Sequence, residues 1–305
     1  MIACIGAGVI GGGWAAFYLA HGHDVVAWDP APDAEARLRR TIEAARPALN
    51  DLGLPDEAWG GLRFAASLEE AVRDAEFVQE SAPEDLAIKR SVLADLVATT
   101  GEDVAVASST SGFPMTEMAT EARDPSRLVV GHPFNPPYLI PLVEVVGGEA
   151  TSPAVVKAAA EFYRGLGKSV IEMDREVPGF VANRLQEALW REALHMVANG
   201  EATVDQIDAA ITDGPGLRWP VQGPCLTFHL AGGEGGMAHM LDHFGPSLLA
   251  PWTRLEAPEL TAELRDAMVE GTATEAGGRD VAALVAERDR AVIAIRRAVD
   301  AARRG

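Results

Sequence analysis

The sequence contains only two cysteines, Cys4 and Cys225, in 305 residues. Two cysteines are too few for a disulfide framework or a cysteine-based zinc site, and we expect each to be a small buried hydrophobic residue. No apolar run reaches the roughly eighteen residues that a membrane span needs. The first predicted strand begins at Ile2 and leaves no room for a signal peptide, so we expect a cytoplasmic protein.

Positive charge is also scarce. The chain has 26 Lys and Arg against 45 Asp and Glu, which gives a formal net charge of −19 at pH 7. This balance argues against nucleic acids and anionic membranes as partners, and leaves a small molecule as the expected ligand. A hydrophobic content of 48% is ordinary for a globular protein, and the length is sufficient for two domains.

The first half of the chain alternates short β-rich runs with helical patterns. This alternation predicts an α/β fold with a Rossmann-type doubly wound, mostly parallel sheet. The expected strands are Ile2–Ile5, Val25–Trp28, Leu62–Ala65, Phe77–Gln79, Val104–Ala107, Leu128–Gly131, Leu142–Val146 and Ser169–Glu172. The expected helices are Val9–Ala20, Ala34–Leu52 and Pro153–Gly165.

Strand patterns stop after Pro178. Helical periodicity then covers residues 179–199, 203–212, 224–243 and 279–303, with a Gly- and Pro-rich loop or broken helix at 213–224. We therefore expect a first domain of residues 1–177 and an all-α second domain of residues 178–305. The last helix should be amphipathic, packing on its own domain or forming a dimer contact.

A glycine-rich motif directly follows the first strand and opens a helix. Gly6 permits the tight turn, Gly8 lets the backbone approach a pyrophosphate, and Gly11 allows close packing of helix on strand. The amides at the helix N-terminus, around Val9 and Ile10, would face the phosphates. The motif predicts a dinucleotide-binding domain.

The second strand ends at Asp29, about twenty residues downstream, where an acid would hold the adenosine ribose hydroxyls. Asp29 would also suit a turn or a helix cap, since Pro30 follows it. No arginine occurs after Asp29 until Arg37, and a carboxylate repels a 2′-phosphate. The sequence therefore predicts NAD rather than NADP as the cofactor.

His132 and Glu144 are the predicted catalytic pair. His132 follows a predicted strand in the Pro-rich segment 131–137, where it could accept an alcohol proton as hydride leaves, or merely cap the loop. Glu144 interrupts the apolar segment 139–146, and a buried carboxylate needs a partner, for which His132 is the candidate. Such a pair would fix the imidazole tautomer, unless Glu144 lies on a solvated face.

Two further polar residues are candidates for the same site. Ser111 follows another predicted strand, and Asn183 interrupts the apolar start of a helix just after the domain boundary. Each would hydrogen-bond the reacting oxygen, or would serve as a cap or as a satisfied core amide.

These pieces resemble the 3-hydroxyacyl-CoA dehydrogenase superfamily over most of the chain. The matching stretches are GAGVIGGGW at 6–14, WDP at 28–30, ESAPEDLAIK at 80–89, SSTSG at 108–112, GHPFNPPYLIPLVEV at 131–145 and VPGFVANRL at 177–185. The resemblance implies that His132 is the general base with Glu144 as its partner, and that Ser111 and Asn183 bind substrate. It also implies a homodimer formed through the helical domain.

The same resemblance implies further cofactor contacts. Glu84 and Lys89 match positions that line the nicotinamide end of the NAD site. Ser109 stands where the family often has Asn, so the resemblance implies a weaker or replaced cofactor contact at this position.

The second half narrows the expected substrate. Residues 214–260 are most similar to the branch of the superfamily that oxidises L-carnitine to 3-dehydrocarnitine, and more loosely to the branch that oxidises L-gulonate. Residues 33–60 contain arginines but no lysine, whereas enzymes acting on CoA thioesters usually carry lysines there. L-Carnitine is thus the expected substrate. L-3-hydroxyacyl-CoA and L-gulonate are the alternatives, and an inert NAD-binding structural protein is the non-enzymatic one.

The substrate hypothesis also predicts an aromatic cage. A trimethylammonium group donates no hydrogen bond and is recognised by aromatic faces. Aromatic residues form only 6% of the chain, yet Trp190, Trp219, Phe228 and Trp252 fall in the second domain. We predict that Trp219 and Phe228, beside the glycine-rich loop, contact the substrate, with ordinary core packing as the alternative.

Overall fold

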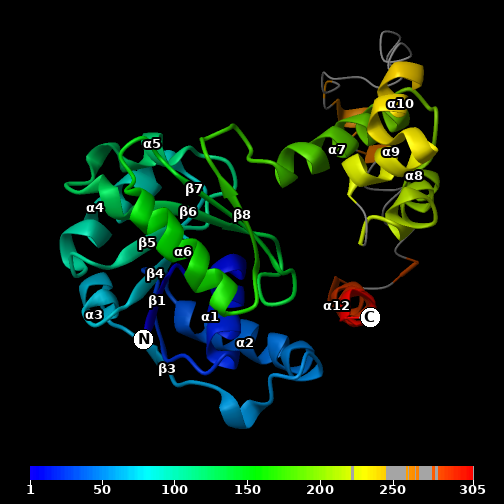
Figure 1. Cartoon of the computed structure of the whole chain (residues 1–305). Helices are drawn as coiled ribbons and strands as arrows, with labels where there is room; N and C mark the ends of the chain where they lie inside the picture. The colour runs from blue at the N-terminus through cyan, green and yellow to red at the C-terminus, as the bar shows by residue number, and fades with distance from the viewer. Residues whose placement is uncertain are drawn as a thin grey trace. The chain divides into compact units, whose positions relative to one another are not determined.

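A computed structural model describes residues 1–220, 223–244, 259, 261–264, 266–267, 277–278 and 281–304. The chain divides into two compact units, Met1–Asn183 and Arg184–Gly305, called unit 1 and unit 2 below (Figure 1). The division lies a few residues after the boundary expected near Pro178.

Unit 1 is built on an eight-stranded sheet of order β3-β2-β1-β4-β5-β6-β7-β8. Its strands are β1 (Ile2–Ile5), β2 (Val25–Trp28), β3 (Leu62–Phe64), β4 (Phe77–Glu80), β5 (Ala105–Ser108), β6 (Leu128–Pro133), β7 (Leu142–Gly147) and β8 (Ser169–Met173). Neighbouring strands are parallel except β6 and β7, which pair antiparallel. The predicted Rossmann-type, mostly parallel sheet is confirmed, and order 3-2-1-4-5-6 is that of dinucleotide-binding sheets.

Helices cover both faces of this sheet (Figure 1). One face packs against α1 (Val9–Ala20), α2 (Ala34–Asp51) and α6 (Pro153–Gly165), and the other against α3 (Leu68–Val72), α4 (Leu86–Thr99) and α5 (Met115–Met118). Short 3-10 helices are η1 (Asp56–Ala58), η2 (Ala119–Glu121) and η3 (Pro125–Arg127). Successive strand residues serve opposite cores: Ile2 and Cys4 of β1 lie in the first, Ala3 and Ile5 in the second.

Helix α4 is an element that the sequence analysis did not identify. It begins after Asp85, whose carboxylate accepts a hydrogen bond of 2.9 Å from the Ile88 amide. Its amphipathic pattern is weak because a charged residue, Lys89, lies on the buried face while the apolar Ile88 is exposed. The helix matters for the site, since it carries Lys89 inward.

Unit 2 is helical in the part that the structure describes. Its helices are α7 (Ala182–Ala198), which starts in the last residues of unit 1, α8 (Val204–Thr212), α9 (Pro224–Ala231), α10 (Gly236–Phe244) and α12 (Val281–Arg304). The 3-10 helices η4 (Pro215–Leu217) and η5 (Gly233–Gly235) lie between them. The predicted all-α second domain is confirmed.

Three local predictions need correction. The helical pattern at 224–243 is broken between α9 and α10, because four glycines occur in residues 232–236 and Gly233 and Gly236 adopt φ values of +60° and +57°. Helix α7 starts at Ala182 rather than 179, since Gly179 and Phe180 have positive φ. Cys4 is buried as expected, but Cys225 is exposed in the first turn of α9.

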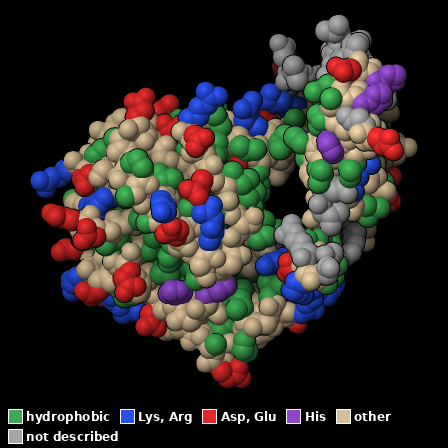
Figure 2. All heavy atoms as spheres, in the orientation of Figure 1, with side chains coloured by type: hydrophobic (Ala, Val, Ile, Leu, Met, Phe, Trp, Pro, Cys, Tyr) green, Lys and Arg blue, Asp and Glu red, His purple; other side chains and the backbone are tan. Residues whose placement is uncertain are grey.

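The surface of unit 1 mixes both signs of charge. Figure 2 shows basic side chains interspersed among the more numerous acidic ones on the visible face. No helix among the described residues is long and apolar enough to cross a membrane.

Candidate active site

The glycine-rich loop after β1 has the shape that a dinucleotide requires. A Cβ atom at Gly6 (φ +95°) would lie 2.4 Å from the Ser81 carbonyl oxygen, and one at Gly11 would lie 1.9 Å from the Gly6 carbonyl oxygen. At Gly8, by contrast, no described atom lies within 4 Å of the Cβ position. The loop is therefore closed toward the sheet and open at the residue where a pyrophosphate would approach.

The N-terminus of α1 is free to receive an anion. The helix starts at Val9 with no cap from a described side chain and no acidic residue in its first turn. The first amides of a helix lack intrahelical partners and carry partial positive charge. The loop and the helix start therefore fit the phosphates of NAD.

Asp29 lies at the end of β2 with both carboxylate oxygens oriented by the backbone. One oxygen accepts from the Ala7 amide at 2.7 Å and the other from the Ala31 amide at 2.8 Å. The hydrogen bond from the Ala31 amide forms a turn, which is the alternative that the sequence offered for Asp29. A carboxylate has about four acceptor sites, so Asp29 keeps capacity for ribose hydroxyls. Just beyond it lies a pocket of about 440 Å³, lined by Ala31, Asp33, Ala34, Glu35, Ala36, Arg39 and Phe64.

His132 and Glu144 face each other across the antiparallel pair β6 and β7. The two residues are direct partners in the strand register, and His132 Nδ1 lies 2.9 Å from Glu144 Oε2. Both are buried, His132 at 3% exposure and Glu144 at 0%. The contact expected from the apolar sequence around Glu144 is present.

The other oxygen of Glu144 binds the start of α7. Glu144 Oε1 accepts hydrogen bonds from the Val181 and Ala182 amides, at 2.9 and 3.0 Å. Burial alone would raise the pKa of Glu144, but the hydrogen bonds from His132 and from these two amides lower it below its ordinary value. Glu144 is therefore held as a carboxylate, which leaves Nδ1 of His132 as the hydrogen-bearing nitrogen.

Asn183 connects His132 with Ser111. Its Nδ2 donates to the Ser111 carbonyl oxygen at 2.8 Å and lies 3.5 Å from His132 Nε2. The Ser111 hydroxyl has no hydrogen bond with the described residues, and Ser111 is exposed. All four predicted catalytic residues thus lie at one place in unit 1.

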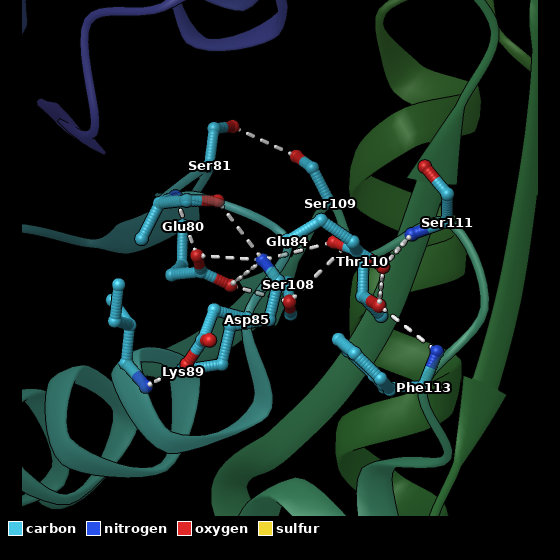
Figure 3. Close-up of polar contacts among 12 residues, drawn as sticks. Glu80, Ser81, Glu84, Asp85, Lys89, Ser108, Ser109, Thr110, Ser111 and Phe113 are labelled. Carbon is cyan, nitrogen blue, oxygen red and sulfur yellow. Dashed lines mark hydrogen bonds and ion pairs between the residues drawn. The ribbon is translucent and has the colours of Figure 1, made fainter.

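The loop that carries Ser111 is held by Glu84 (Figure 3). Glu84 Oε1 accepts from the Thr110 hydroxyl at 2.7 Å and from the Ser111 amide at 2.9 Å. Glu84 Oε2 lies 3.5 Å from Lys89 Nζ. Glu84 thus fixes the backbone at Thr110 and Ser111, and its contact with the cofactor stays a prediction.

Lys89 is buried rather than open to the cofactor side. Its side chain is 1% exposed and pairs at 3.0 Å with Glu80, whose side chain is fully buried. The Ser108 hydroxyl also binds Glu80 (Figure 3). A direct contact between Lys89 and the cofactor stays a prediction. Sequence reasoning missed Glu80, which ends the buried strand β4 and follows another polar residue, Gln79.

Ser109 lies in a separate hydrogen-bonded group. Its hydroxyl contacts Gln79 Nε2 and the Ser81 hydroxyl, each at 2.9 Å. Ser109 is buried, and Ser81 is partly exposed beside the glycine-rich loop. Whether Ser109 meets the cofactor stays a prediction.

The predicted cage residues lie in unit 2. Trp219 follows η4 and is 36% exposed, and Phe228 in α9 is 51% exposed, as is Trp190 in α7. None of the ring contacts among the described residues joins Trp219 to Phe228. Trp252 lies outside the described residues. The cage stays a prediction.

Almost the whole chain is similar in sequence to known dehydrogenases. L-Carnitine dehydrogenase of Streptomyces griseus subsp. griseus is 70% identical over 298 residues, covering 97% of this chain and 89% of that protein. The Pseudomonas aeruginosa L-carnitine dehydrogenase is 54% identical, with coverage of 96% and 92%.

A crystal structure of the NAD⁺-dependent dismutase 5-formyl-3-hydroxy-2-methylpyridine 4-carboxylic acid 5-dehydrogenase superposes with a TM-score of 0.84, at 31% identity and 98% coverage of both chains. Residues 1–177 match the NAD binding domain of 3-hydroxyacyl-CoA dehydrogenase, and residues 179–280 match its C-terminal domain. NAD is thus the cofactor of this dehydrogenase. The chain belongs to the 3-hydroxyacyl-CoA dehydrogenase family.

Proposed function

We propose that this protein oxidises the 3-hydroxyl of L-carnitine to 3-dehydrocarnitine, with His132 as the general base. The reaction is supported by the His132–Glu144 pair and by the open glycine-rich loop of the same unit. The substrate is supported by 70% identity to an L-carnitine dehydrogenase over 97% of the chain. NAD, when bound, supplies the acceptor for the hydride that leaves carbon 3.

The pair of nitrogens at the site suits a hydroxyl group. His132 Nε2 is an acceptor, because Nδ1 carries the hydrogen that is donated to Glu144, and Asn183 Nδ2 is a donor 3.5 Å away. A substrate hydroxyl would donate to the histidine and accept from the asparagine. These two hydrogen bonds would point the hydroxyl hydrogen at His132 Nε2 and keep the hydroxyl oxygen in a fixed position.

Proton transfer converts His132 into an imidazolium. Glu144 is already a carboxylate at 2.9 Å and stabilises the new charge without moving. The Val181 and Ala182 amides hold Glu144 in place, and Phe180 and Phe134 pack against the imidazole, with ring centroids 5.2 and 5.0 Å away. In this proposal the Ser111 hydroxyl is a second donor to the substrate oxygen.

For recognition of the substrate, we propose that Trp219 and Phe228 contact the trimethylammonium group. Both present exposed aromatic surface in unit 2. Cation–π contacts with a quaternary ammonium need no hydrogen-bond donor from the ligand.

The proposal includes a cytoplasmic homodimer formed through the helical domain. Large apolar side chains are exposed along α7, including Leu185 at 55% and Leu189 at 47%. Burying such a stripe between two copies would remove it from water. Sedimentation or light scattering on the purified chain tests the oligomeric state.

The first experiment is NADH formation at 340 nm with L-carnitine, D-carnitine, L-gulonate and L-3-hydroxybutyryl-CoA, at roughly pH 9 because oxidation releases a proton. We expect turnover of L-carnitine alone. Turnover of another substrate would keep the mechanism and overturn the substrate. If none of the four substrates is turned over although NAD still binds, the result would favour a structural NAD-binding protein.

A further inference from the structure

A buried polar group connects the core of unit 1 with the cofactor edge of the sheet. Gln79, the third residue of β4, is fully buried, and its Oε1 accepts from the Tyr18 and Tyr163 hydroxyls at 2.9 and 2.6 Å. Burial raises the pKa of both phenols, so both remain protonated donors. On its other side, Gln79 faces Ser109. Ser109 in turn faces Ser81 (Figure 3).

The direction of hydrogen donation along this group is determined. Gln79 Nε2 lies 3.5 Å from the Ala107 carbonyl oxygen, which can only accept, and Oε1 lies between two phenolic donors. Nitrogen must therefore face Ser109, and Gln79 donates to the Ser109 hydroxyl at 2.9 Å. The amide cannot be flipped without breaking these contacts.

The Ser109 hydroxyl needs an acceptor for its own hydrogen. Its hydroxyl accepts from Gln79, and the Ser81 oxygen at 2.9 Å is its only acceptor among the described residues. Ser109 is 8% exposed, and a buried hydroxyl hydrogen without an acceptor is unfavourable. Ser109 therefore donates to Ser81, and the hydrogen of Ser81 is directed away from this pair.

Ser81 lies where the dinucleotide passes over the sheet. It is the first residue after β4, its amide donates to the Ile5 carbonyl at the end of β1, and a Cβ at Gly11 would lie 3.3 Å from its own Cβ. The strand order reverses between β1 and β4, and ligands of doubly wound sheets bind at that crevice. The outward hydroxyl thus stands beside the glycine-rich loop.

We propose that Ser81 donates its hydroxyl hydrogen to an oxygen of the pyrophosphate or the adjoining ribose of bound NAD. Ser109 and Gln79 orient that donor without touching the cofactor. The inference rests on NAD as the cofactor and adds to its site one hydrogen-bond donor that is oriented from the core. It also changes the expected part of Ser109, from a cofactor contact to a positioning residue.

The test is the dissociation constant of NAD and of ADP-ribose, measured by calorimetry on the purified full chain. Ser81→Ala should weaken both ligands about tenfold, since one hydrogen bond to a charged group is lost. Ser109→Ala should weaken them less, roughly threefold, because the donor remains but is no longer oriented. Ser91→Ala, an exposed serine on α4, is the matched control and should change neither.

Thermal unfolding without ligand checks that each variant folds, and Ser81→Cys, a weaker donor of similar shape, should fall between wild type and Ser81→Ala. Equal affinities of Ser81→Ala and wild type would overturn this inference alone, as would a larger loss in Ser109→Ala. A loss with NAD but not with ADP-ribose would assign the donor to the nicotinamide group and overturn the proposed acceptor. Wild-type protein that fails to bind NAD would contradict the cofactor as well.

Discussion

The two units differ in how their functional side chains are held. In unit 1, Glu144 is fixed by hydrogen bonds with His132 and with the backbone at the start of α7, and the Asn183 side chain is fixed by its hydrogen bond to the Ser111 carbonyl. In unit 2, Trp219 and Phe228 have large exposed surfaces, and only Leu264 and Ile293 are buried hydrophobic residues among its described residues.

In the proposed function, the chemistry belongs to unit 1 and the recognition of the trimethylammonium group belongs to unit 2. A base that must accept a proton works best when its geometry is set before the substrate arrives. Exposed apolar surface, by contrast, contributes favourable binding free energy only when a ligand covers it and removes it from water. Substitutions in unit 1 should therefore change turnover or folding, and substitutions of the cage candidates in unit 2 should change the affinity for substrate.

The largest effect is expected for His132→Ala. Loss of the general base should lower kcat roughly a thousandfold, while the dissociation constant of NAD stays unchanged. Steady-state kinetics and calorimetry check both values. His239→Ala, a histidine of α10 in unit 2, is the matched control and should keep full turnover. A His132→Ala enzyme within a few fold of wild type would remove His132 from its role.

Lys89→Met tests the buried ion pair of unit 1. It leaves the Glu80 carboxylate buried without a countercharge, which should lower the free energy of unfolding by about 3 kcal/mol in chemical denaturation. Adding Glu80→Gln should recover most of this loss, because both charges are then absent. The exposed Arg39 pairs with Glu35, and Arg39→Met should cost much less. Equal costs for Lys89 and Arg39 would contradict the assigned burial.

Glu144→Gln should lower kcat on the order of a hundredfold. The amide cannot stabilise an imidazolium, and its NH₂ group can bind Nδ1 and favour the tautomer with hydrogen on Nε2. The Michaelis constant for L-carnitine should change little. Stopped-flow measurement of the hydride-transfer step separates this loss from slow product release, and an unchanged rate would show that the pair is only structural.

Trp219→Leu tests the recognition side of the comparison. It should raise the Michaelis constant for L-carnitine about tenfold and leave kcat and the NAD affinity near wild type. Trp190→Leu, another exposed tryptophan of unit 2, serves as control. A fall in kcat with an unchanged Michaelis constant would break the division between the two units.

The smallest effect concerns pH. The pKa of Glu144 is lowered in the folded chain from its ordinary value of 4.5, so this carboxylate stabilises the fold above that pH. The contribution disappears as pH falls below 4.5 through the folded pKa. Thermal unfolding midpoints of wild type and Glu144→Gln should therefore converge in acid. A constant difference between the two unfolding midpoints at all pH values would contradict a contribution of ionised Glu144 to stability.

Much of the fold follows from alternating patterns, and the dyad follows from one charged residue in an apolar strand. The same argument applies to Glu80, which ends the buried strand β4, although Gln79 beside it makes that strand less apolar than β7. Residues 232–236 interrupt a helix because they hold four glycines, whereas the apolar periodicity on both sides predicts a continuous helix. The antiparallel register that pairs His132 with Glu144 depends on the path of the loop between them, which periodicity does not encode.

That loop imposes a condition on how the chain can vary. His132 and Glu144 are separated by 12 positions along the chain and meet through a local hairpin, whereas parallel neighbours in the sheet need a long crossover. Side chains alternate along a strand, so a shift of the pairing by one residue would turn Glu144 to the opposite face. An insertion or deletion over residues 134–141 that shifted the pairing by one residue would therefore separate His132 from Glu144.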